Sequence, residues 1–183
     1  MSWLNTIILF LVTLLAVYWE AAFTGLRSIF GVQVDLLPPL IVYAGLYGSL
    51  ATLSFTALFG GLLFDSLSAN PLGITVLPLF VGGLGIHSSR ELILRDQTFA
   101  QLVLGFAASL LTPVLVLLLL LTTRHQPLFG WGTAWQLLVM SVGGAIATPV
   151  FFELFGLLNR LLGHAAPAQS SFRPDREIRR GRS

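Results

Sequence analysis

The sequence lacks cysteine and lysine entirely and has few charges of either sign. Only 10% of its 183 residues are charged, against about 25% in an average soluble domain, while 55% are hydrophobic. Without cysteine there is no disulfide scaffold and no metal–thiolate or thiol redox site. The low charge and the mean hydropathy of +0.86 exclude a disordered chain and a water-soluble domain, and they indicate a protein that lies in a lipid bilayer.

Recognisable catalytic, metal-binding and nucleotide-binding patterns are missing as well. The sequence contains no zinc-protease motif, no serine-hydrolase motif, no Walker loop and no acidic pair spaced to hold a metal. The three histidines, His87, His125 and His164, are far apart and lie near the ends of predicted helices. We therefore expect a protein that is not an enzyme and that has no cofactor, no metal and no nucleic-acid partner.

The sequence does contain long uncharged runs. A helix needs about 20 apolar residues to cross about 30 Å of hydrocarbon. Four of the runs fit one helix each, and one is longer than a single span requires. The runs, His125 aside, are 1–19, 36–64, 66–89, 97–123 and 126–152.

The long run 36–64 allows two interpretations. As one helix it would be about 43 Å long and strongly tilted. As a hairpin it would form two short helices with a turn at 45–49, where glycines flank a polar segment. We prefer the hairpin, because Asp35-Leu36-Leu37-Pro38-Pro39 is typical of a helix start with prolines in its first turn.

The predicted fold is therefore an all-α integral membrane protein, a six-helix transmembrane bundle in a domain 1–163. An arginine-rich cytoplasmic tail follows at 164–183. The predicted spans are about 3–22, 36–47, 49–65, 72–89, 98–123 and 133–156.

The arginines predict the orientation. With six spans and both termini inside, eight arginines lie in the cytoplasm and two, Arg27 and Arg124, lie outside. A five-span alternative with the N-terminus outside gives nine against one, so both alternatives place the tail in the cytoplasm. The eight are Arg90, Arg95, Arg160, Arg173, Arg176, Arg179, Arg180 and Arg182.

Three acids border the predicted spans, and a carboxylate within a bilayer is costly enough to suggest a purpose. We expect Glu20 at the outer head groups and Glu153 beside Arg160 at the inner interface. Asp65 is the strongest candidate, either as a helix cap or as part of a partner-binding surface, because it ends a small-residue helix and begins a polar turn. The candidate partner-binding or structural residues are Asp65, Asn70, Pro71, Gly73, Gly60, Gly61, Pro38 and Pro39.

Glycines predict where the helices pack closely. Lipid supplies no hydrophobic force between helices, so small faces that allow close backbone approach hold a bundle together. Such faces occur at 45–48, 60–61, 82–85 and 143–144. The fifth predicted span is by contrast almost all large and aliphatic over 110–121, and we expect it to face lipid or a hydrophobic partner helix.

Two segments give the chain a resemblance to a known family. They are D-L-L-P-P-L at 35–40 and G-G-L-L-F-D-S-L-S-A-N-P-L-G at 60–73. Together with the span pattern, they make residues 1–163 resemble the MreD family of bacterial rod-shape-determining membrane proteins. The resemblance implies a non-catalytic, multi-pass protein of the bacterial cytoplasmic (inner) membrane that supports lateral peptidoglycan synthesis and rod cell shape.

The resemblance also implies partners. Members of this family act in the cell-elongation machinery with the single-span protein MreC, the actin-like MreB, the glycosyltransferase RodA and a class B penicillin-binding protein, and membrane lipids surround them. The family is also similar in fold to the substrate-binding components of energy-coupling-factor vitamin transporters. A small-molecule-binding subunit of that kind is the alternative, although the leucine-rich first span, Leu4–Trp19, lacks their alanine-spaced docking pattern.

Overall fold

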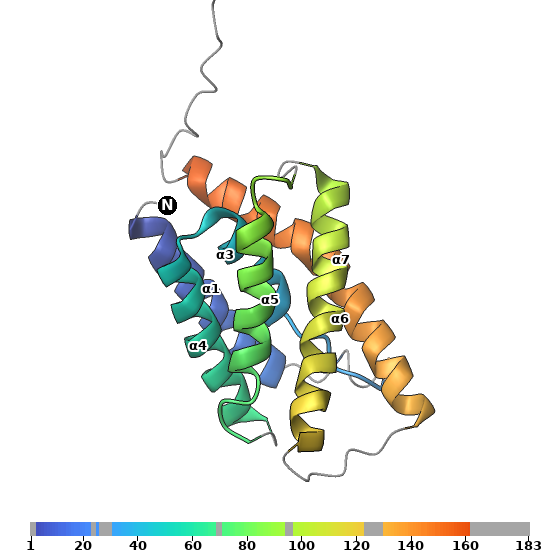
Figure 1. Ribbon diagram of the computed structural model, residues 1–183. Coiled ribbons are helices and arrows are strands. Elements are labelled where there is room, and N and C mark those ends of the chain that lie inside the picture. The colour runs from blue at the N-terminus through green and yellow to red at the C-terminus, as the bar shows by residue number, and fades with distance from the viewer. Residues whose placement is uncertain are drawn as a thin grey trace, which may run out of the picture.

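The computed structural model describes residues 3–22, 25, 31–68, 71–93, 97–122 and 130–161. Asn70 and the tail 164–183 lie outside these ranges. Within them the chain forms six helices, as predicted, joined by turns and loops (Figure 1). The helices are α1 (Trp3–Ala22), α3 (Leu37–Tyr47), α4 (Leu50–Leu67), α5 (Val76–Ser89), α6 (Thr98–Thr122) and α7 (Trp131–Leu161).

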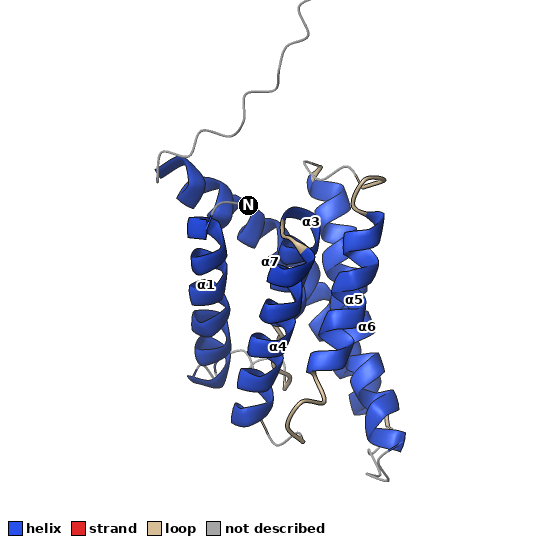
Figure 2. Ribbon diagram, turned by 60° about the vertical axis from the view of Figure 1, so that its left-hand side comes forward, coloured by secondary structure: helices blue, strands red, loops and turns tan. Residues whose placement is uncertain are grey.

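The helices form one bundle with two ends (Figures 1 and 2). The upper end in Figure 1 holds the start of α1, the α3–α4 turn, the end of α5 and the end of α7, and we call it the Arg90 end. The lower end holds the ends of α1, α4 and α6 and the starts of α5 and α7, and we call it the Asp65 end. The long α7 crosses behind the other helices at an angle.

Four of these helices, α1, α4, α6 and α7, are long and apolar enough to cross a membrane. The other two, α3 and α5, have 11 and 14 residues. A helix of 11 residues is about 16 Å long, half the thickness of the hydrocarbon. The short helix expected at about 36–47 is present, and the one expected at about 72–89 begins four residues later, at Val76.

The short α3 lies in the centre of the bundle. It contacts every other described helix, and its residues Leu37 to Leu46 are all buried. A segment without regular structure, 33–36, leads into it from the Asp65 end. Because α3 is enclosed by protein rather than lipid, it does not have to match the bilayer, and non-helical backbone beside it is tolerated.

The preferred hairpin for 36–64 is present, with a tighter turn than predicted. Gly45 and Leu46 stay inside α3, and only Gly48 and Ser49 lie between α3 and α4. The Ser49 hydroxyl accepts a hydrogen bond of 3.1 Å from the Thr52 amide and so caps α4. A Cβ at Gly48 would collide with the Ala44 carbonyl oxygen, which explains the glycine.

The α6–α7 interface is the most extensive contact between helices. Its closest approach is made by small residues: a Cβ at Gly105 would collide with Thr148, and one at Gly144 would collide with Ser109. The fifth predicted span, expected to face lipid or a hydrophobic partner helix, packs one side of its first half against α7, while Phe99, Val103 and Phe106 stay exposed. Gly105 was not among the glycines expected to pack closely.

Candidate functional site

Asp65, the strongest sequence candidate, joins the end of α4 to the start of α5. Its side chain is 2% exposed. One carboxyl oxygen accepts a hydrogen bond of 3.1 Å from the Thr75 amide, and the other accepts one from the Thr75 hydroxyl. The carboxyl group thus holds the two helices together across the turn, and it does not reach the surface where a partner would bind.

Other candidates surround this joint. Gly60 lies against Leu37 of α3, and Gly61 lies against the backbone of Val76 at the start of α5. In the turn that follows, Pro71 is exposed, and Gly73 has φ +86°, a left-handed conformation that favours glycine. Gly60 and Gly61 therefore allow α4 to pack closely against α3 and α5 beside Asp65.

The start of α3 is a buried helix terminus whose amides are all accounted for. The Leu37 amide donates a hydrogen bond of 2.8 Å to Asp35 Oδ1, and the Leu36 amide donates to the Glu20 carboxyl group. Pro38 and Pro39 have no N–H to satisfy. The D-L-L-P-P segment thus builds a helix start that can lie inside a membrane protein without unpaired donors.

Glu20, Asp35 and Asp65 come together at the Asp65 end. Glu20 interacts electrostatically with Asp35, and Asp35 with Asp65. All three are buried, with 6%, 4% and 2% of their surface exposed. The positive end of the α3 dipole favours carboxyl groups at this position. Glu20, expected among the outer head groups, is buried at the Asp65 end, because α1 packs its last turn against the segment 33–36.

Asp35 was not among the predicted site residues, and Glu20 was expected at the head groups rather than in a buried cluster. The motif itself pointed to Asp35. At the start of this helix only the Leu36 and Leu37 amides need acceptors, because the two prolines have no N–H, and the Asp35 carboxyl group can accept from one of them. Nothing near Glu20 in the sequence indicated its role, because its carboxyl group reaches the Leu36 amide only in the folded structure. Glu153, the third acid considered, is exposed on α7.

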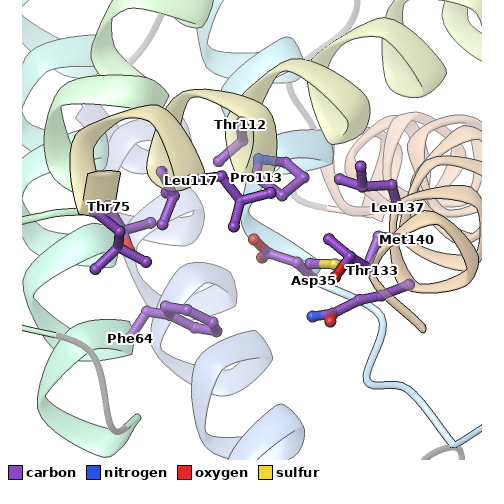
Figure 3. A pocket seen from close by; sticks show the side chains of 12 residues that line it. Asp35, Phe64, Thr75, Thr112, Pro113, Leu117, Thr133, Leu137 and Met140 are labelled. Carbon is purple, nitrogen blue, oxygen red and sulfur yellow. The ribbon is translucent and has the colours of Figure 1, made fainter. Parts of the chain in front are cut away.

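A cavity of about 210 Å³ adjoins this cluster. Figure 3 shows the Asp35 carboxyl group directed into it, with Thr75 and Phe64 on one side and residues of α6 and α7 enclosing the rest. Within the described ranges, no three histidine or acidic side chains are placed to hold a metal ion. The described groups of this cluster therefore act as hydrogen-bond acceptors for backbone and hydroxyl donors.

Comparison of the chain with protein-family models, with curated proteins and with solved structures finds no match.

Proposed function

We propose that this chain is a non-catalytic membrane scaffold of the bacterial cell-elongation machinery, of the kind that the MreD family provides. In this proposal it lies in the cytoplasmic membrane and binds the single transmembrane helix of an MreC-like partner. RodA, its class B penicillin-binding protein and an MreB-like actin are associated directly or through that partner. The protein thereby supports lateral peptidoglycan synthesis and rod cell shape.

One observation carries this proposal. The two segments on which the resemblance rests, 35–40 and 60–73, are far apart in sequence, yet Gly60 packs against Leu37 and Asp35 lies close to Asp65. Both segments thus contribute to one buried joint. A shared motif is expected to consist of residues on which the fold depends, and these residues meet that expectation.

The exposed face of α6 is the proposed contact surface for the partner helix. Phe99, Val103, Phe106 and Leu110 are exposed at spacings of three and four residues, so they line one side of the helix. Helices associate in lipid through packing and through hydrogen bonds of about 0.6–2 kcal/mol each. The exposed turn residue Leu72 extends the candidate surface at the Asp65 end.

The arginines support an orientation for the scaffold. Arg90 ends α5 and Arg160 lies in the last turn of α7, so both belong to the Arg90 end of the bundle. The positive-inside rule then favours a cytoplasmic Arg90 end and a cytoplasmic C-terminus. The Asp65 joint consequently faces the outer side of the membrane.

Co-purification tests the scaffold and its surface separately. The full chain is expressed with the MreC-like protein of the same genome, and the partner recovered in detergent is measured. We expect Val103→Trp on α6 to reduce recovery strongly, because a bulky ring blocks helix packing. The matched control, Val150→Trp at an exposed position of α7, leaves recovery unchanged. Equal recovery with both variants rejects the α6 surface, and no recovery with the unmodified chain rejects the scaffold function.

The cavity beside Asp35 favours a second candidate, the vitamin-binding subunit of an energy-coupling-factor transporter. Its volume of about 210 Å³ is below the range of about 300–1,000 Å³ that is usual for small-molecule sites, so we rank this candidate second. Native mass spectrometry of the purified chain decides between the two. A retained vitamin-sized ligand supports the transporter subunit, and its absence supports the scaffold.

A further inference from the structure

A second hollow in the bundle is a groove between the end of α1, the non-helical segment 33–36 and the first half of α7. Its volume is about 510 Å³, within the range of about 300–1,000 Å³ that small-molecule sites have. Leu138, Val142 and Ile146 of α7 line it and are exposed on the outer surface of the helix. The groove is therefore apolar and is accessible from the side, where lipid surrounds the protein.

Glu20 lines this groove, and one oxygen of its carboxyl group has no partner among the described residues. One oxygen of its carboxyl group accepts from the Leu36 amide, while Oε2 is buried and has no hydrogen-bond partner among the described residues. Only 6% of the side chain is exposed. A buried carboxyl oxygen without a donor is costly, so its presence beside a groove indicates that a ligand supplies the donor.

Two further features describe that ligand. Trp19 and Trp135 both line the groove, and tryptophan is enriched at the level of lipid head groups. Gln33 lines it too, and its side-chain amide donates to the Glu20 backbone carbonyl, which holds this wall in place. The groove therefore combines a wall suited to an acyl chain with one acidic group at head-group level.

We propose that this groove binds one phospholipid whose head group carries a primary ammonium, as in phosphatidylethanolamine. The ammonium donates to Glu20 Oε2, and one acyl chain lies along Leu138, Val142 and Ile146. A charge-assisted hydrogen bond of this kind is stronger than a neutral one. A choline head group has no N–H to donate to Glu20. A glycerol head group has no cation to balance the negative phosphate, so both head groups fit this groove less well.

Native mass spectrometry of the full chain tests the proposal. The chain is purified in detergent and offered equal amounts of phosphatidylethanolamine and phosphatidylcholine with identical acyl chains. We expect about tenfold more retained phosphatidylethanolamine, the difference that one such bond produces. Glu20→Gln removes this preference, whereas Glu153→Gln, which alters an exposed acid on α7, keeps it. Equal retention of the two lipids by the unmodified chain, or an unchanged preference in Glu20→Gln, overturns the proposal.

A second variant keeps the test valid should Glu20→Gln not fold. Ala147 lines the groove from α7, and Ala147→Phe fills the space while leaving Glu20 in place. We expect this variant to lose both lipids; full retention of phosphatidylethanolamine contradicts the proposed location. No partner protein enters this test, so the proposed lipid site and the proposed scaffold function can be refuted separately.

Discussion

Gly61 tests the close packing of α4 against α5, because its neighbours include backbone atoms of Val76, which cannot rotate away. A Cβ at this position would lie 2.8 Å from Val76 Cγ2, 2.9 Å from Val76 Cα and 3.0 Å from Val76 N. Ordinary contacts of this kind begin near 3.4 Å. Gly61→Ala therefore forces the first turn of α5 away from α4, at the point where Asp65 binds Thr75.

The expected magnitude follows from comparison with a glycine that has free space. Gly85 lies inside α5, and nothing stands within 4 Å of a Cβ placed there. Alanine gains about 1 kcal/mol of helix propensity over glycine at either site. The difference in the free energy of unfolding between Gly61→Ala and Gly85→Ala therefore measures the cost of overpacking, which is about 1–3 kcal/mol. A chain of this size loses about 2–4 °C of melting temperature for each kcal/mol.

Thermal unfolding in detergent, followed by far-UV circular dichroism, measures this difference. We expect Gly61→Ala to melt below Gly85→Ala by a few to about 12 °C. Adding Val76→Ala to Gly61→Ala removes the Cγ2 contact but leaves the two backbone contacts, so stability is not restored. Equal melting temperatures for Gly61→Ala and Gly85→Ala, or full rescue by Val76→Ala, would refute the close α4–α5 approach.

Three further predictions concern the same end of the bundle and its orientation. Asp65→Ala leaves two buried donors of Thr75 without an acceptor, at a cost of about 1–3 kcal/mol each, and a melting temperature equal to that of the unmodified chain would exclude the bond. Gly73→Ala places a side chain at φ +86° and costs about 1–2 kcal/mol, which denaturant titration measures; no loss argues against the left-handed turn. In this cysteine-free chain, Leu72→Cys reacts in intact cells with an impermeant thiol reagent, whereas Leu50→Cys, at the other end of α4, reacts only after permeabilisation. The reverse pattern inverts the proposed orientation.

Much of the fold could be predicted because its signals are local. The uncharged runs located all six described helices, and the glycine-flanked segment 45–49 located the α3–α4 turn to within three residues. These features depend on hydropathy and on turn chemistry, which belong to short stretches of chain. The glycines at 60–61 likewise indicated close packing, and the structure places Gly61 against Val76.

The candidate site could be predicted only in part. Asp65 stood out because it interrupts an apolar run, but its partner Thr75 lies ten residues away across the turn. The burial of Glu20 could not be predicted, because next to Trp19 at the end of a span it has the sequence context of a head-group residue. Gly105 was overlooked, because its importance comes from Thr148 on another helix.

By itself the sequence determined that the chain enters a bilayer, where its helices begin and end to within a few residues, and which segment turns between α3 and α4. Only the tertiary structure decided that α3 is enclosed, that Glu20, Asp35 and Asp65 meet at its start, and that a groove opens beside them. The reason is physical. In lipid, burial of apolar surface does not choose which helix faces pack, so the arrangement depends on close fit and on satisfying buried polar groups. Those conditions join residues that are distant in sequence.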